Sequence, residues 1–251
     1  MKPLTEMNRE ELCALRVEDC TNLFSAEEFL SIAKLLGAFW MYDYQALKDG
    51  RPGLHAELKS GRHSDGFFAA KILLSQGNML DIISHQMLCK LESTDIQLSD
   101  YPDYVVGIPD SATHLGQAIA RRLLIQDDIL LMKDENGHMV TDQISICSSK
   151  NILIVEDVCT RATATREAVQ LIQSQGWDAP NILPYVLVIL NRGGLSTIRA
   201  GDLDVEVLPL VTCRMNDWES AECPLCEQGS QAIKPKRSQE SWDALVSSQI
   251  G

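Results

Sequence analysis

The stretch ILIVEDVCTRATATRE, residues 152–167, places four apolar residues directly before two adjacent carboxylates, Glu156 and Asp157. A hydroxyl-rich segment follows and leads into a helical pattern from about residue 163. In an open α/β sheet, ligands bind at the carboxyl ends of the strands. A loop that opens a helix there offers unpaired N–H groups and a favourable dipole to a phosphate.

Hydroxyl donors strengthen this interpretation, because Thr160, Thr163 and Thr165 all lie in the loop or the first helical turn. Two carboxylates would repel a phosphate, so they suit sugar hydroxyls or a metal ion better. The stretch therefore predicts a site for a phosphorylated sugar, with the acids at the ring and the loop at the phosphate. Spacing alone leaves an alternative open, in which the acids are a solvated strand end and Thr163 is an ordinary helix cap.

Apolar strand patterns alternate with helical patterns on both sides of this stretch. This order predicts an α/β fold with a mainly parallel sheet covered on both faces. Residues 133–143 are expected to be a polar segment with a turn at Asn136-Gly137, and residues 213–238 to be irregular. The predicted strands are 66–74, 104–108, 129–132, 151–155, 182–190 and 203–211, and the predicted helices are 26–48, 78–91, 113–125 and 163–175.

Composition excludes several classes of protein. With 45% apolar residues the chain can bury a core, which excludes a disordered polypeptide. The 22 basic and 35 acidic side chains give a net charge of −13, which argues against nucleic acid or an anionic membrane as partner. The longest apolar run, residues 182–190, is too short for a membrane span of ~20 residues. Without an apolar signal core, the eight cysteines are expected to be mostly reduced, in a cytoplasmic protein.

The acid pair and threonine loop resemble the phosphoribosyl-pyrophosphate (PRPP) binding loop of type I phosphoribosyltransferases, in particular the orotate phosphoribosyltransferase branch. Three further segments resemble the same branch in the same order: LKSGRHSDGFF at 58–68, VVGIPDSAT at 105–113 and NRGG at 191–194. Taken alone, they are also compatible with a polar turn, a plain strand–helix connection and a surface salt bridge. Together the resemblance covers roughly residues 55–235.

The resemblance implies a Rossmann-like type I phosphoribosyltransferase fold, with a parallel sheet flanked by helices and a small N-terminal hood. The expected divisions are N-terminal helices and hood at 1–75, a PRPP-binding α/β core at 76–212 and an irregular tail at 213–251, in one compact unit. The implied partners are PRPP and a nucleobase, with orotate favoured, and a second copy of the chain in a homodimer.

The resemblance also implies roles for individual residues. Mg²⁺ is the implied cofactor, held by Glu156 and Asp157 directly or through water. The implied catalytic residues are Glu156, Asp157, Lys133 and His138; the PRPP-binding residues are Val158, Cys159, Thr160, Arg161, Ala162, Thr163, Ala164, Thr165, Asp110 and Ser111; and the base-binding residues are Phe67, Phe68, Lys71 and Arg192.

The chain departs from the family pattern at three places. Arg161-Ala162 stands where the family usually has a small residue or Thr and then Gly; if position 162 needs a positive φ, Ala costs about 1 kcal/mol. The segment 133–138 keeps one Lys and one His among two acids, although the family's mobile loop is rich in cations. Asn191 replaces the Asp of the base-side pair. Three hypotheses follow: an orotate phosphoribosyltransferase, a relative that uses another base, or a PRPP-binding regulatory protein without turnover.

The tail segment CPLCEQG, residues 223–229, resembles a C-terminal element of some orotate phosphoribosyltransferases. Its two cysteines supply two of the four ligands of a zinc site. The sequence shows no second pair at a suitable spacing, so a thiol-bearing turn is expected in preference to a metal site.

Overall fold

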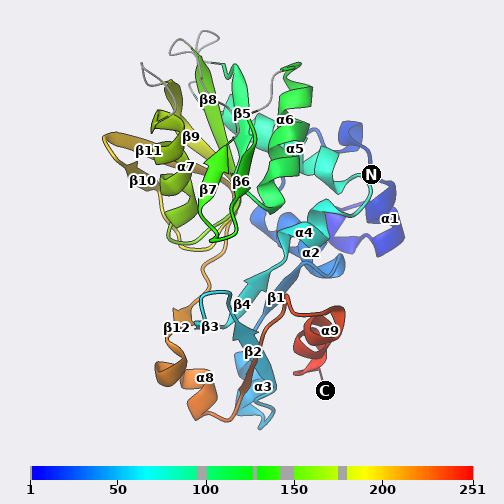
Figure 1. Ribbon diagram of the computed structural model, residues 1–251. Helices are drawn as coiled ribbons and strands as arrows, with labels where there is room; N and C mark the ends of the chain where they lie inside the picture. The colour runs from blue at the N-terminus through cyan, green and yellow to red at the C-terminus, as the bar shows by residue number, and fades with distance from the viewer. Residues whose placement is uncertain (1, 95–100, 127–128, 142–149, 175–179, 251) are drawn as a thin grey trace. The chain divides into compact units, whose positions relative to one another are not determined.

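The computed structural model describes residues 2–94, 101–126, 129–141, 150–174 and 180–250. The chain forms two compact units, each built from two separate segments (Figure 1). The first unit consists of Met1–Leu36 and Ala70–Cys213, and the second of Gly37–Ala69 and Arg214–Gly251. Among the described residues, no helix is both long enough and apolar enough to cross a membrane.

A five-stranded sheet in the order β10-β11-β9-β8-β5 forms the centre of the first unit. Four neighbouring strands run parallel, and β10 is antiparallel to β11. This confirms the predicted α/β fold with a mainly parallel sheet. The strands are β5 (Tyr104–Gly107), β8 (Asn151–Cys159), β9 (Asn181–Asn191), β10 (Thr197–Ala200) and β11 (Leu203–Thr212).

Both faces of this sheet are buried, because strand β8 carries Ile152, Leu153, Ile154 and Val155 without solvent exposure. Ile152 and Ile154 share one core cluster with Ala168, Val169 and Ile172 of α7 (Thr163–Ser174). The opposite face meets α5 (Met79–Glu92), which packs on β9 and β11, and α6 (Ser111–Arg122), which packs on β5 and β8.

Shorter elements complete the first unit. The N-terminal segment forms η1 (Leu4–Glu6), α1 (Arg9–Ala14), η2 (Val17–Asp19) and α2 (Ala26–Leu35), and α4 (Ala70–Leu74) precedes α5. An antiparallel hairpin joins β6 (Leu131–Lys133) to β7 (Met139–Thr141).

The second unit contains a four-stranded sheet in the order β12-β3-β2-β13 and an antiparallel pair of β1 with β4. Residues far apart in the sequence meet here, since β13 lies parallel to β2 and β12 antiparallel to β3. The elements are β1 (Phe39–Met41), α3 (Tyr44–Lys48), β2 (Leu54–Glu57), β3 (His63–Ser64), β4 (Gly66–Phe68), β12 (Asp217–Trp218), η4 (Ser220–Glu222), α8 (Pro224–Glu227), β13 (Gln231–Ile233) and α9 (Gln239–Ser247).

Two predicted elements are wrong in this region. The helix predicted over 26–48 is two helices separated by strand β1; Gly37 ends the first helix with a φ of +73°, and the aromatic residues after it favour a strand. The strand predicted over 66–74 is β4 followed by α4.

Other differences concern boundaries and the tail. Strand β8 continues through the acid pair to Cys159, and β7 and β10 were not predicted. The tail expected to be irregular contains α8, β13 and α9. The closing glycine predicted for helix 163–175, Gly176, lies outside the described residues.

Candidate active site

Three of the predicted loops leave the sheet at the same edge. The parallel register pairs Gly107 of β5 with Val155 of β8, and Cys159 of β8 with Asn191 of β9. Each loop therefore starts at the carboxyl end of its strand, which is where open α/β sheets bind ligands. The candidate site is built from residues 109–111, 156–165 and 191–194.

The two acids have different surroundings. Glu156 is only 6% exposed, and its Oε2 accepts a hydrogen bond of 2.6 Å from Thr165 Oγ1. Burial raises the pKa of Glu156 to about 7, against the opposing effect of the Thr165 bond, and Asp157 adds a smaller upward contribution. Successive strand residues face opposite sides of a sheet, and Asp157 is partly exposed. Asp157 is therefore the more accessible carboxylate.

The threonine loop contains a strained residue at the predicted position. Ala162 has a φ of +55° and is 2% exposed, immediately before α7 begins. Arg166 ties the loop to the helix, because its N–H donates to Ala162 O at 3.0 Å and its Nη1 to Arg161 O at 2.6 Å. Arg161 itself is exposed.

The turn after β9 packs directly on this loop. The N–H groups of Arg192 and Gly193 both donate to Cys159 O, at 2.8 and 3.1 Å. A Cβ atom on Gly193 would lie 1.9 Å from Thr160 O, so this close approach requires glycine. The predicted base-binding Arg192 is thereby anchored, through its backbone, beside the threonine loop.

Asn191 has a structural role that an Asp could not fill. Its Oδ1 accepts from the N–H of Gly194 at 2.8 Å and of Leu195 at 3.2 Å, and its Nδ2 donates to Leu195 O at 2.7 Å. A carboxylate could accept the first two bonds but has no proton for the third. Asn191, which replaces the Asp of the family pattern, therefore stabilises the turn through three hydrogen bonds of its side-chain amide.

A cavity of about 400 Å³ lies beside the loop after β5. Asp110 and Ser111, predicted for the pyrophosphate, share its lining with Lys71, which was predicted for the base. The peptide bond between Pro109 and Asp110 is cis. Sequence reasoning missed His114, Gln117 and Arg121, which line the same cavity from α6; their spacing of three and four residues on one helix face could have indicated them.

Lys133 and His138 flank the turn of the β6–β7 hairpin and are exposed. Asp134 organises this turn, since its Oδ1 accepts from the N–H groups of Asn136 and His138 at 2.9 and 2.8 Å. These backbone bonds lower the pKa of Asp134, and its Oδ2 lies 3.6 Å from His138 Nδ1. An acid thus lies beside one of the two implied catalytic residues of the hairpin.

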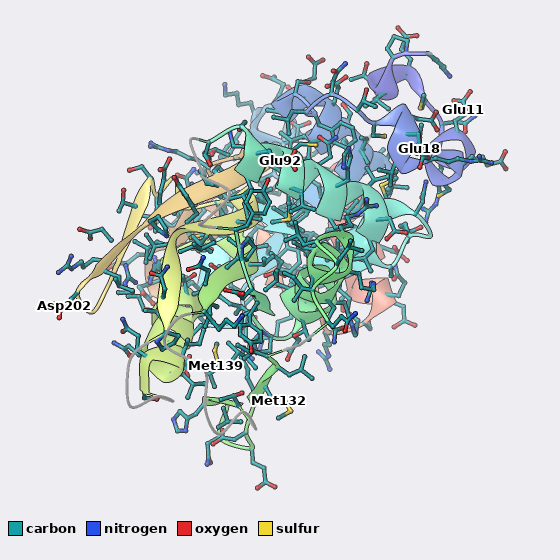
Figure 2. The ribbon with its side chains drawn as sticks, turned by 90° about the horizontal axis from the view of Figure 1, so that it is seen from above. Glu11, Glu18, Glu92, Met132, Met139 and Asp202 are labelled. Atoms are coloured by element: carbon teal, nitrogen blue, oxygen red, sulfur yellow. The ribbon has the colours of Figure 1, made fainter. Side chains whose placement is uncertain are left out.

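One face of the hairpin packs on the core of the unit, and the other face is exposed to solvent. Met139 is 5% exposed in the core and Met132 is 45% exposed (Figure 2). The N–H of Met139 donates to Glu167 Oε1 of α7 at 2.9 Å. The hairpin is therefore hydrogen-bonded to α7, the helix that begins after the threonine loop.

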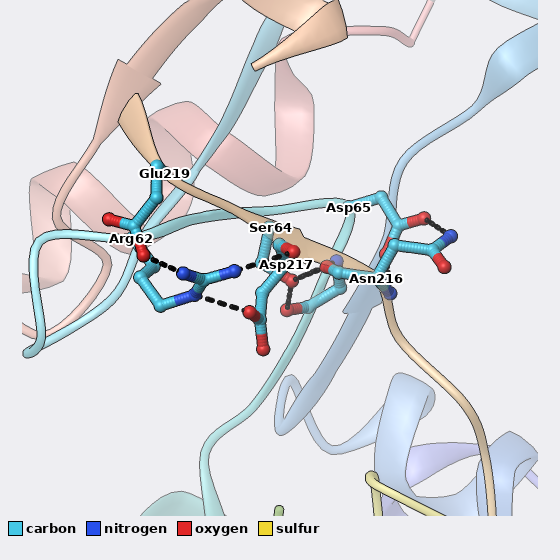
Figure 3. A network of polar contacts seen from close by, with 7 residues as sticks. Arg62, Ser64, Asp65, Asn216, Asp217 and Glu219 are labelled. Atoms are coloured by element: carbon cyan, nitrogen blue, oxygen red, sulfur yellow. Dashed lines mark hydrogen bonds and ion pairs between the residues drawn. The ribbon is translucent and has the colours of Figure 1, made fainter. Parts of the chain in front are cut away.

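The predicted base-side segment belongs to the second unit, where its polar side chains hold the fold together (Figure 3). Arg62 forms ion pairs with Asp217 and Glu219. Asp65 accepts from Asn216 through the backbone N–H at 2.8 Å and through Nδ2 at 2.7 Å. These contacts fit the polar-turn interpretation of the segment.

Phe67 and Phe68 are both buried within the second unit. The ring of Phe67 lies 5.7 Å from that of Trp242, and Lys236 Nζ lies 5.8 Å from the Phe67 centroid. Phe68 pairs with Phe39 across β1 and β4. Their role in base binding stays a prediction.

Comparisons with curated proteins give relatives named orotate phosphoribosyltransferase. The chain is 26% identical over 182 residues to an orotate phosphoribosyltransferase of Pelotomaculum thermopropionicum, covering 72% of this chain and 87% of that protein. It is 26% identical over 194 residues to the orotate phosphoribosyltransferase of Caldicellulosiruptor bescii, covering 77% and 92%. No protein-family model matches the chain.

Among solved structures, the orotate phosphoribosyltransferase of Aeropyrum pernix aligns with 73% of this chain and 93% of its own, at 18% identity and a TM-score of 0.49. The two sequence relatives each align with more than 70% of this chain. The chain is therefore a homologue of curated proteins named orotate phosphoribosyltransferase, the branch that its sequence motifs resemble.

Proposed function

We propose that the chain transfers a 5-phosphoribosyl group from PRPP to orotate and releases pyrophosphate. The observation that carries the proposal is the convergence of three loops at one sheet edge, with the acid pair and the threonine loop in the centre. The names of the curated relatives support orotate as the acceptor.

In this reaction the bond between ribose C1 and pyrophosphate breaks, and an acceptor ring nitrogen takes its place. C1 becomes oxocarbenium-like, so catalysis depends mainly on positioning and on neutralising the leaving charge. Residues 158–165 would hold the 5′-phosphate through backbone N–H groups and the N-terminus of α7. Asp110 and Ser111 would contact the pyrophosphate, and Lys133 and His138 would approach it from the hairpin.

The acid pair would contact the ribose hydroxyls. Asp157 fits a Mg²⁺ ligand, because it is a partly exposed carboxylate at a strand end and Mg²⁺ prefers oxygen ligands. Glu156, which is buried and bonded to Thr165, would orient the loop and act on the ion through water. When bound, Mg²⁺ would neutralise charge on the pyrophosphate.

The decisive measurement is pyrophosphate release from PRPP with orotate and Mg²⁺. We expect turnover with orotate and much less with adenine, hypoxanthine or uracil. Asp157→Asn should lower the rate by roughly 10²-fold. Asp202→Asn is the matched control; this acid is fully exposed in the turn between β10 and β11 (Figure 2), and its loss should leave the rate unchanged.

A second candidate function is PRPP binding without turnover. The observation that favours it is the hairpin, in which Asp134 holds His138 and Glu135 adds another negative charge. PRPP-dependent thermal stabilisation with no pyrophosphate release for any base would establish it. Turnover with a base other than orotate would instead make the chain a relative of different specificity.

The homodimer and the cytoplasmic location are also proposals. The seven cysteines in the described part of the chain are all free thiols, which supports a reducing compartment. Light scattering on the purified chain tests the homodimer, and a monomer with full activity would contradict it.

A further inference from the structure

Two histidines and two cysteines converge in the second unit. His55 lies on β2, His63 on β3, and Cys223 and Cys226 enclose the first turn of α8. His55 Nε2 lies 3.5 Å from Cys223 Sγ, 3.6 Å from Cys226 Sγ and 3.1 Å from His63 Nδ1. His63 Nδ1 lies 3.3 Å from Cys226 Sγ. The four ligand atoms all lie within 4.8 Å of one another.

These distances match the edges of a tetrahedral metal site. Zinc bonds of about 2.3 Å to sulfur and about 2.0–2.1 Å to nitrogen place two nitrogens about 3.3 Å apart and a nitrogen and a sulfur about 3.6 Å apart. The nitrogen–nitrogen distance between the histidines is 3.1 Å, and three of the four nitrogen–sulfur distances run from 3.3 to 3.6 Å. The side chains are therefore already arranged around a common centre.

The backbone holds this arrangement from both sides. Strands β2 and β3 place the histidines next to each other, since Glu57 pairs with His63 two residues beyond His55. After the cysteines, the chain turns at Gly229, with a φ of +87°, and returns as β13 beside β2. The N–H of Gly229 donates to Cys226 O and that of Ser230 to Leu225 O, both at 3.0 Å.

Hydrogen bonds through Ser230 determine which ring nitrogen of His55 carries the hydrogen. Ser230 Oγ donates to Gly53 O at 3.1 Å, so its oxygen is available to accept from His55 Nδ1–H at 2.9 Å. This leaves the lone pair of Nε2 facing the cysteines, the arrangement typical of a metal-bound histidine.

A thiol pair or a disulfide would not account for the two histidines of the cluster. It would need the two cysteines but not two buried histidines, which are 0% and 8% exposed and aim their nitrogens at the sulfurs. Three of the four side chains are buried and Cys226 is exposed. Two thiolates balance the charge of a divalent ion, which makes the cluster electrically neutral. Four protein ligands leave no open position, and such closed sites are structural.

We propose that the second unit binds one structural zinc ion through His55 Nε2, His63 Nδ1, Cys223 Sγ and Cys226 Sγ. The proposal departs from the expectation of a thiol-bearing turn. The site lies apart from the acid pair and the threonine loop in the sequence, and its occupancy does not require the proposed transfer reaction.

Metal analysis of the full chain, purified without chelator, tests the proposal. We expect one zinc per chain, and its loss in Cys223→Ser and in His55→Gln. The matched control is Cys89→Ser, whose thiol lies 3.5 Å from His85 Nε2 on α5 in a pair that supplies only two ligands. This variant should keep its zinc. Zinc that persists in Cys223→Ser, or that disappears in Cys89→Ser, would overturn the assignment.

Because a ligand variant could lose zinc by unfolding, the wild-type chain provides an independent test. After removal of metal by a chelator under reducing conditions, we expect Co²⁺ to bind at one per chain with the strong visible absorption of tetrahedral thiolate cobalt, and Zn²⁺ to displace it. A spectrum of octahedral cobalt, or no binding of either ion, refutes the proposal. All these measurements omit PRPP and orotate, so their outcome is independent of the transferase assay.

Discussion

At the scale of single residues, Ala162 is a strained position in the candidate site. A non-glycine residue in the left-handed region costs about 1–2 kcal/mol, and Ala162 has a φ of +55°. Ala162→Gly should therefore raise the free energy of unfolding by about 1 kcal/mol, measured by urea denaturation. Ala164→Gly, two residues further and inside α7, should lower it by roughly 0.5–1 kcal/mol. Equal effects of the two substitutions would contradict this explanation.

Glu156 should make stability depend on pH in a distinctive direction. Burial raises its pKa from 4.5 to about 7, so the folded state binds the proton more tightly than the unfolded state. The stabilisation is complete below pH 4.5 and is lost as pH rises through 7, with a magnitude on the order of 3 kcal/mol. In the metal-free chain, Glu156→Gln should flatten this fall in the free energy of unfolding. Glu206→Gln, exposed on β11 of the same sheet, should keep it.

The sequence allowed the strain at position 162 to be predicted, because the family places glycine there. It did not reveal the different environments of Glu156 and Asp157. Both are acids at the same strand end, and only the continuation of β8 to Cys159 puts one in the interior and leaves the other accessible.

At the scale of elements, the loop after β9 packs so closely on the loop after β8 that no side chain fits at position 193. A Cβ at position 193 would meet Thr160 O at 1.9 Å, so Gly193→Ala forces backbone movement. We expect it to lower the free energy of unfolding by more than about 3 kcal/mol. Gly137→Ala is the control, with a φ of +83° but no atom within 4 Å of its Cβ position, and it should cost about 1 kcal/mol. Similar losses in urea denaturation would show that the close approach is unimportant.

Elements were predictable where burial alone determines the pattern. Strands β5 and β9, and β8 from Ile152 to Val155, are largely apolar runs because both faces of their sheet are covered. The helix predicted over 26–48 failed because Phe39 and Trp40 match a helical spacing but belong to β1, which pairs with β4. Phe39 pairs with Phe68 and Trp40 with Phe67, and partners this far along the chain do not appear in a local pattern.

At the scale of the whole molecule, metal removal should affect the two units differently. If zinc joins β2, β3 and α8, chelation should speed amide hydrogen exchange in β2, β3 and β13, because their cross-link is lost. Exchange in β5, β8 and β9 should change little, since that sheet has its own core. Uniform acceleration across both sheets, or none in β2, would contradict this prediction.

The division into two units and the metal cluster were the least predictable features. Each depends on contacts between residues 37–69 and 214–251, which the sequence separates by the entire parallel sheet. The Cys223–Cys226 pair supplied half of a ligand set. Of the other half, His63 lay in a segment interpreted as a polar turn, and His55 belonged to no motif. Spacing rules for zinc sites assume that ligands come in nearby pairs.

The interleaving of segments also has a consequence for biosynthesis. On the ribosome, residues 37–69 emerge long before their partners at 214–251. Strands β2 and β3 therefore lack their partners β13 and β12 until the C-terminal segment has been synthesised. A chain that stops before Cys223 could complete the parallel sheet but never close the second unit, so a translational pause or premature stop near the C-terminus would leave open β-edges exposed to aggregation.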